Sequence, residues 1–232
     1  SKCAENLKTQ IYKPKYNSKE MEDKTFVINI GRQLGSGGKE IGLRLAEMFG
    51  ITCYDNELIK RAAKESGIDA GNFENSDEKK QGTRSFFSNF IPFVGSGDIY
   101  GNPISEETLF RIQSETIKKI AAEHSCIFIG RCADYVLRDK KRCANVFVSA
   151  DYADRVKRLC LRRVITAQAA EKLIRQGDQQ RSQYYNFYSD GTWGSADTYH
   201  LCINSSVFGI EGTTEFIAEF IEKKLGISRP AK

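Results

Sequence analysis

Residues 28–42 read I-N-I-G-R-Q-L-G-S-G-G-K-E-I-G, and this stretch decides the fold. It overlaps a short β-branched, apolar run at 25–30, which is typical of a buried strand. Residues 39–49 then carry apolar side chains on one helical face, and Gly50 suits the end of that helix. Glycines let backbone N–H groups at a helix N-terminus approach a phosphate, and a lysine adds a full positive charge. The stretch therefore predicts a phosphate-binding strand, loop and helix.

The loop departs from the Walker A pattern G-x-x-x-x-G-K-[ST] at two positions. Gly38 and Lys39 match, but Gln33 stands at the first glycine and Glu40 replaces the hydroxyl residue that contacts magnesium. A dinucleotide-binding Rossmann unit is a competing interpretation, because Asp55 ends the next predicted strand. Against it, Glu40 occupies the third glycine position of G-x-G-x-x-G. A tight strand-to-helix turn without a ligand is the third alternative.

Strand and helix patterns alternate along the rest of the chain. Further strands are predicted at 51–54, 126–129, 144–150 and 201–204. Helices are predicted at 57–64, 105–124, 133–137 and 213–225, and a long basic helical region at about 152–181. This alternation predicts an α/β fold with a central parallel sheet of about five strands and helices on both faces.

The α/β pattern does not cover the whole chain. Residues 1–23 are polar and are expected to form an N-terminal tail, and 227–232 a C-terminal tail. Between them, 24–226 is expected to be a single domain. Within it, residues 66–104 lose the periodicity and contain repeated Gly, Asn and Ser turns. Loops of such length are usually functional or mobile, so this segment is predicted to be an irregular insertion.

Composition excludes several classes of protein. Hydrophobic residues make up 40% and charged residues 28% of the 232, which excludes a largely disordered chain. No apolar run reaches the length of a membrane span. Seven cysteines without a C-x-x-C pair, and two distant histidines, fit neither a disulfide scaffold nor a zinc site. They favour a reducing cytoplasm, and nothing marks out a Cys–His catalytic pair.

The basic excess is local. The formal net charge is +5, whereas residues 155–181 alone hold eight Lys and Arg against two acidic residues. A solvated helix face, a clamp over phosphate groups and a contact surface for nucleic-acid backbone all fit such a run. The sequence of this segment alone leaves the three interpretations open.

Two further features could contribute to a ligand site. Arg131 and Asp134 follow the predicted strand 126–129, and carboxyl ends of strands are where open α/β sheets bind ligands. An ordinary surface ion pair is the alternative. A late aromatic group could stack a base, although a packing patch is favoured. Its members are Tyr184, Tyr185, Phe187, Tyr188, Trp193 and Tyr199.

The order of the motifs indicates a family. G-S-G-G-K-E-I at 35–41 is followed by Y-D-N-E-L-I at 54–59, I-G-R-C-A-D at 129–134, D-Q-Q-R at 178–181 and L-C-I-N-S-S at 201–206. Over about residues 25–226 this order resembles the cytidylate kinase-like family, P-loop nucleoside monophosphate kinases related to bacterial cytidylate kinase. The resemblance implies a three-layer P-loop NTPase-type fold with a helical lid at about 152–190.

The resemblance also implies an activity. The expected reaction transfers the γ-phosphoryl group of ATP, with Mg²⁺, to CMP, dCMP or a related monophosphate, in the cytoplasm. The expected partners are small nucleotides, with neither nucleic acid nor membrane. Two alternatives remain: a degenerate P-loop protein that senses a nucleotide without catalysis, and a nucleic-acid-binding module. Glu40 and Ile41 favour the sensor, because cytidylate kinases carry a Thr where Ile41 stands.

Site residues follow from the resemblance position by position. The ATP phosphates would be held by Gly35, Ser36, Gly37, Gly38 and Lys39. Glu40 would assist through a water or weaken triphosphate binding by repulsion. The acceptor would be held by Asp55, Arg61, Arg111, Arg131 and Asp134. Transfer would be catalysed by Lys39, Arg131, Arg155, Arg158, Asp178 and Arg181. No protein ligand to a metal is expected, so phosphates and water would mainly hold magnesium.

Overall fold

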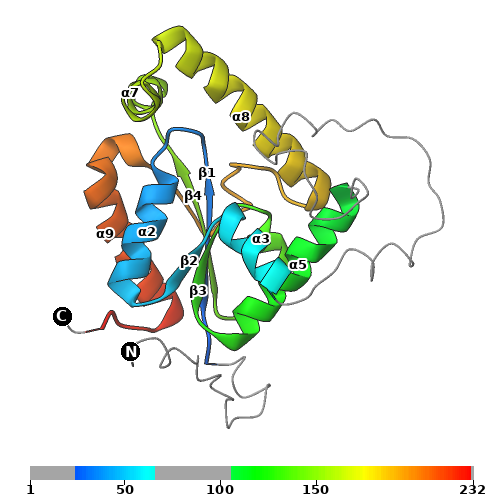
Figure 1. The fold of residues 1–232 in the computed structure, drawn as a ribbon. Helices are drawn as coiled ribbons and strands as arrows, with labels where there is room; N and C mark the ends of the chain where they lie inside the picture. Colours follow the sequence, from blue (N-terminus) through cyan, green and yellow to red (C-terminus); the bar gives the residue numbers. More distant parts are fainter. Residues whose placement is uncertain (1–23, 66–105, 231–232) are drawn as a thin grey trace, which may run out of the picture.

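The computed structural model describes residues 24–65 and 106–230 (Figure 1). The strands are β1 (Val27–Arg32), β2 (Thr52–Tyr54), β3 (Cys126–Ile129), β4 (Cys143–Ser149) and β5 (Leu201–Asn204). The helices are α2 (Gly38–Phe49), α3 (Asn56–Glu65), α5 (Glu106–Glu123), α6 (Ala133–Val136), α7 (Tyr152–Arg163), α8 (Ala167–Tyr188) and α9 (Ser205–Leu225). The tail predicted at 1–23 and the insertion predicted at 66–104 lie outside the described residues.

The five strands form one parallel sheet in the order β2-β3-β1-β4-β5. In the central strand β1, Val27 pairs with Cys126 of β3 on one side and with Cys143 of β4 on the other. Helices α2 and α9 cover one face of the sheet, and α3 and α5 cover the other (Figure 1). The predicted three-layer α/β fold, with a parallel sheet of five strands and helices on both faces, is therefore confirmed.

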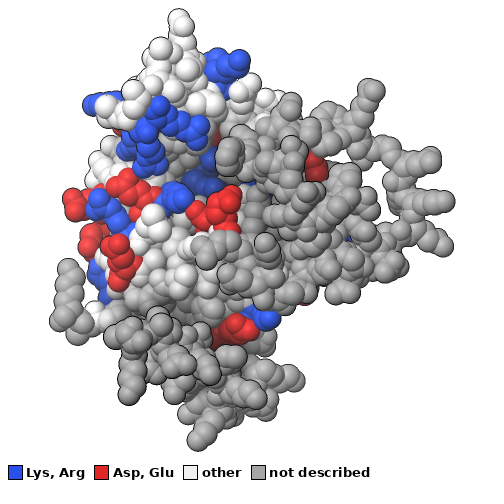
Figure 2. All heavy atoms as spheres, in the orientation of Figure 1, with Lys and Arg blue, Asp and Glu red and all other residues white. Residues whose placement is uncertain are grey.

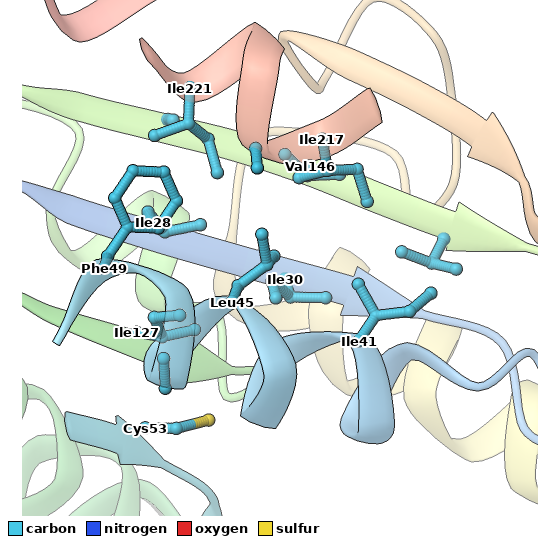
Figure 3. Packing of buried hydrophobic residues seen from close by; sticks show 14 of the residues in the cluster. Ile28, Ile30, Ile41, Leu45, Phe49, Cys53, Ile127, Val146, Ile217 and Ile221 are labelled. Carbon is cyan, nitrogen blue, oxygen red and sulfur yellow. The ribbon is translucent and has the colours of Figure 1, made fainter. Parts of the chain in front are cut away.

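Successive side chains of β1 point to opposite faces of the sheet and pack against both helical layers. Ile28 and Ile30 pack with α2 and α9, whereas Val27 belongs to the cluster on the opposite face. Figure 3 shows the first cluster, in which α2 contributes Ile41, Leu45 and Phe49 and α9 contributes Ile217 and Ile221. Because the first four residues of β1 are buried, they form an apolar run with one asparagine. The core thus fixes the position at which the glycine loop leaves the sheet.

The basic helical region predicted at about 152–181 consists of two helices. It divides into α7 and α8, because Val164 ends α7 in a left-handed conformation with φ of 53°. Thr166 then caps α8 by accepting a hydrogen bond from the Ala169 N–H. Left-handed backbone is rare for a β-branched residue, so the sequence carried no signal for this break.

The last helix begins at Ser205, well ahead of the predicted start at Thr213. Asn204 caps it through a hydrogen bond from the Ser206 N–H. Gly209, with φ of 68° and ψ of 178°, interrupts the helix and breaks its apolar period, which explains the late prediction. Among the described helices, none is both long enough and apolar enough to cross a membrane.

Burial on α2 predicts a contrast between two leucines. Leu45 is fully buried and Leu43 is 46% exposed. We expect Leu45→Ala to lower the free energy of unfolding by about 2–5 kcal/mol, because it leaves a cavity under the sheet. Leu43→Ala is the matched control and should change it by about 0.5 kcal/mol or less. Urea denaturation measures both, and equal effects would contradict the packing described here.

Candidate functional site

Every strand of the sheet ends at the same site. The glycine loop Gln33–Lys39 follows β1, Asp55 follows β2 and Arg131 follows β3. Helix α7 follows β4, and Ser205 follows β5. Because the strands are parallel, these segments meet at the carboxyl edge, where open α/β sheets bind their ligands.

The glycine loop presents an open helix N-terminus. Gly37 is the N-cap of α2, with φ of 83°, and no side chain caps it. The first N–H groups of α2 therefore remain available to an anion, and the helix dipole favours negative charge there. Gly35 also has φ of 83°, and a Cβ there would lie 2.8 Å from the Arg155 carbonyl oxygen. A larger residue would push α7 away from the loop.

A closed set of contacts joins the loop to α7 and α8. Arg155 Nε donates to the Leu34 carbonyl over 2.8 Å, and Asp178 accepts from the Leu34 N–H over 2.7 Å. Arg155 and Asp178 also form a close ion pair with each other. Arg155 is only 5% exposed. The predicted lid residues Arg155 and Asp178 thus brace the loop in this structure.

Two further donors occupy loop carbonyls. Arg158 Nη1 lies 3.2 Å from the Gly35 oxygen and 3.3 Å from Ser205 Oγ. Ser205 Oγ in turn donates to the Ser36 oxygen over 2.7 Å, and both serines are fully buried. Sequence reasoning quoted the L-C-I-N-S-S strand end but assigned Ser205 no role. Since these donors bind carbonyl oxygens, they leave the first N–H groups of α2 to an anion.

Lys39 is held by Asp55. Lys39 Nζ lies 2.6 Å from Asp55 Oδ2, and the N–H groups of Glu57 and Leu58 donate to Asp55 Oδ1. Burial raises the pKa of Asp55, but Lys39 and these N–H groups outweigh it and hold the pKa below its usual value. Asp55 is therefore an anion that neutralises Lys39. The lysine side chain is 59% exposed, so it can turn to another anion.

Glu40 is paired with two arginines. Its carboxylate lies 3.3 Å from Arg44 on the next turn of α2 and 3.2 Å from Arg162 on α7. These partners offset the negative charge that Glu40 brings to the loop. The contacts thus weaken the case for repulsion of a triphosphate by Glu40.

Arginines from three separate segments gather beside the loop. Arg32 ends β1, Arg131 follows β3 with a left-handed φ of 64°, and Arg181 lies on α8. Burial, with Arg181 and Arg131 nearby, lowers the pKa of Arg32 to about 9. Burial also lowers the pKa of Arg181, although Asp178 opposes this. Arg181 Nη1 is buried without a hydrogen-bond partner and lies 3.7 Å from Asp178.

Arg32 was missed by sequence reasoning. The available signal was its position, since a charged residue ends a strand that is otherwise buried and immediately precedes the glycine loop. Such a residue points out of the carboxyl edge of the sheet.

The aromatic group divides into two parts. Tyr185 and Tyr199 pack with Phe147 and Cys132, as a packing patch requires. Tyr184 instead lies beside Arg131, whose guanidinium carbon is 5.6 Å from the ring centre. Its hydroxyl donates to Gln113 Oε1 over 3.3 Å.

Three predicted acceptor residues have different surroundings. Asp134 accepts a 2.5 Å hydrogen bond from Tyr185, and burial raises its pKa. Arg111 lies on α5, 3.5 Å from Glu107, and lines a hollow whose described lining contains neither Lys39 nor Arg131. The side chain of Arg61 lies outside the described part of α3.

Comparison with known proteins identifies the family. The model of the cytidylate kinase-like family matches residues 27–207, which span the loop, the arginines and α8. The chain belongs to the cytidylate kinase-like family. The search of curated proteins found no match to the chain.

Solved structures also resemble this cytidylate kinase-like protein. An uncharacterized protein from Eubacterium ventriosum is 25% identical, with a TM-score of 0.65 over 85% of this chain and 99% of that one. Shikimate kinase from Bacteroides thetaiotaomicron is 12% identical, with a TM-score of 0.47 over 85% and 98%. Shikimate kinase from Acinetobacter baumannii, in complex with shikimate, is 13% identical, with a TM-score of 0.46 over 89% and 98%.

The contacts of Arg155 and Asp178 with Leu34 predict that Arg155 contributes to the stability of this cytidylate kinase-like protein. Arg155→Met removes the donor to Leu34 and leaves the Asp178 carboxylate partly buried. We expect the free energy of unfolding to fall by about 3–5 kcal/mol. Arg162→Met on the same helix breaks only an exposed pair with Glu40 and should cost about 1 kcal/mol or less. Urea denaturation distinguishes them, and equal losses would contradict the brace.

The surroundings of Asp134 predict a pH effect. Its pKa is raised above the ordinary 3.8, so the unfolded chain releases this proton first as pH rises. The wild type therefore loses stability between pH 3.8 and the raised pKa, whereas Asp134→Asn does not titrate. We expect the Tm of Asp134→Asn relative to wild type to be higher at about pH 7 than at about pH 4. A lost Tyr185 contact shifts both values equally, so a constant difference would contradict the raised pKa.

Proposed function

We propose that the chain is an ATP-dependent nucleoside monophosphate kinase whose acceptor is CMP, dCMP or a related monophosphate. The observation that carries this proposal is the pairing of two cationic sites at one sheet edge: the open loop with Lys39, and the arginines around Arg131 and Arg181. A kinase of this kind needs one site for the donor phosphates and another for the acceptor phosphate. Membership of the cytidylate kinase-like family supports the same reaction class.

The loop suits the donor phosphates. The uncapped N–H groups of α2 and Lys39 can hold phosphate oxygens once Lys39 leaves Asp55. The described residues contain no group of three or more His, Cys, Asp or Glu that could hold a metal. Mg²⁺ would be held mainly by phosphates and water, because no hydroxyl follows Lys39. Bound Mg²⁺ would neutralise charge on the phosphates.

The arginines suit the acceptor phosphate. Guanidinium groups form paired hydrogen bonds to phosphate and keep their charge. Arg181 Nη1, which lacks a hydrogen-bond partner, would gain one from such an anion. Arg155, Arg158 and Asp178 contribute indirectly, because their contacts hold the loop in place for alignment.

The charge distribution supports this arrangement. Figure 2 shows Lys and Arg side chains gathered at the top of the molecule, over α7 and α8. Acidic side chains lie below them. An anionic nucleotide would therefore be drawn toward the edge of the sheet that carries the loop.

A nucleotide sensor without turnover is the second candidate. Glu40 and Ile41 favour it, because neither supplies the hydroxyl found in this region of kinases that hold magnesium through the loop. Such a protein would bind ATP and form no ADP with any monophosphate. Nucleic-acid binding is less favoured, since Arg155 and Arg158 are directed at the loop.

A panel of nucleoside monophosphates with ATP and Mg²⁺, measured by ADP formation, tests the proposal. We expect turnover with CMP or dCMP, and we expect Lys39→Ala to lower kcat by about 10²- to 10³-fold through loss of charge stabilisation. Arg131→Ala should raise KM for the monophosphate. Lys172→Ala, an exposed lysine of α8, is the matched control and should behave as wild type.

Three outcomes would decide against parts of this proposal. Unchanged turnover in both Lys39→Ala and Arg131→Ala would overturn the assignment of these residues to the active site. ATP binding by calorimetry without ADP formation would select the sensor. Strong affinity for RNA or DNA with a steep salt dependence would favour nucleic-acid binding.

A further inference from the structure

Arg32 is threaded between two glycines. A Cβ placed on Gly38 of the loop would lie 2.6 Å from Arg32 Cβ. At the other end of the side chain, a Cβ placed on Gly130 would lie 1.9 Å from Arg32 Nη1. Both positions therefore exclude any larger residue while Arg32 lies as it does. The side chain runs from the glycine loop to the turn after β3, and it lies close to the backbone at both ends.

The guanidinium of Arg32 has no acceptor of its own. Within residues 24–65 and 106–230 it makes no hydrogen bond or ion pair, and its neighbours include the cations Arg131 and Arg181. Asp55 acts on Arg32 and Asp178 acts on Arg181, but both carboxylates are already paired. Asp55 pairs with Lys39, and Asp178 is shared between Arg155 and Arg181.

Such an arrangement is costly without a ligand. Arg32 lies beside two other cations while no carboxylate of the described residues pairs with it, and a partly buried charge without a partner is unfavourable. One singly charged group would leave positive charge over, whereas a phosphate dianion offsets more of it. Phosphate also matches the fork geometry of guanidinium groups.

We propose that Arg32, together with Arg131 and Arg181, forms a binding site for one phosphate dianion. If the proposed function holds, on which this reading of the ligand rests, that dianion is the phosphate of the acceptor monophosphate. Arg32 is then a substrate-binding residue with a second consequence. Its stem touches Gly38 and its head faces the acceptor, so it sets the acceptor phosphate at a fixed position relative to the donor loop.

Arg32→Ala and Arg32→Lys test this site, with Arg175→Ala as a matched control. Arg175 is an exposed arginine of α8 paired with Glu171, so its loss removes the same charge from outside the site. Calorimetry gives the affinities for CMP and for ATP separately. Thermal unfolding against inorganic phosphate, without ATP, gives the affinity for the anion alone.

We expect Arg32→Ala to lower the affinities for CMP and for inorganic phosphate by about tenfold or more. This is the effect of losing one hydrogen bond to a charged group. Arg32→Lys should fall between it and wild type, because an ammonium keeps the charge and loses the fork. ATP affinity should be unchanged in both, and Arg175→Ala should match wild type throughout. Without ligand, Arg32→Ala should unfold at the wild-type temperature or above, because one of three clustered like charges is gone.

Two results would overturn the assignment. Wild-type affinity for CMP and phosphate in Arg32→Ala would show that Arg32 contacts no anion. Equal losses of ATP and CMP affinity would show that it only supports the loop.

The phosphate measurement separates this inference from the proposed function. If wild type forms no ADP with any monophosphate, while phosphate stabilises wild type and not Arg32→Ala, the kinase proposal fails and the anion site stands. If wild type phosphorylates CMP and Arg32→Ala retains the wild-type KM for CMP, the anion site fails and the kinase proposal stands.

Discussion

The loop between β1 and α2 must leave the first N–H groups of α2 open while its own carbonyl groups are satisfied. A buried carbonyl without a donor is costly, yet any protein acceptor for the first N–H groups of α2 would occupy the anion site. The structure meets both demands with donors from separate elements. Arg155 serves Leu34, Arg158 serves Gly35, and Ser205 serves Ser36. The places of α7 and of the start of α9 follow from this constraint.

The basic residues of the segment 155–181 differ in what they contact. Arg155 is buried against the loop, and Arg181 lies in the arginine group with an unpartnered nitrogen. Arg162 and Arg175 are exposed and pair with Glu40 and Glu171. The positive charges of residues 155–181 therefore have three different surroundings. Some contact the glycine loop, one is a candidate ligand contact, and others form ordinary ion pairs at the solvated surface. No single interpretation of the run describes all of it.

Local pattern predicted much of the fold. The strand, glycine loop and helix at 28–49 depend on neighbouring residues: an apolar run, glycines that allow left-handed backbone, and a helical period of apolar side chains. Failures occurred where local preference was overridden. Val164 takes a backbone conformation that its side chain disfavours, and Gly209 breaks the period of α9. Both lie beside elements whose position depends on the loop.

The sequence by itself determined the α/β class, the parallel strands, the phosphate-loop pattern and the order of motifs that marks the family. It also supplied the candidates Lys39, Arg131 and Arg181. Only the tertiary structure decided which of the arginines meet. The Arg155 contact with Leu34 spans 121 residues, and the Ser205 contact with Ser36 spans 169. No local preference encodes such pairs, because they arise where the parallel strands bring their carboxyl ends to one edge. Arg32 shows the difference most clearly. Its position in the sequence is that of a strand end, and only folding brings it next to Gly38, Gly130, Arg131 and Arg181.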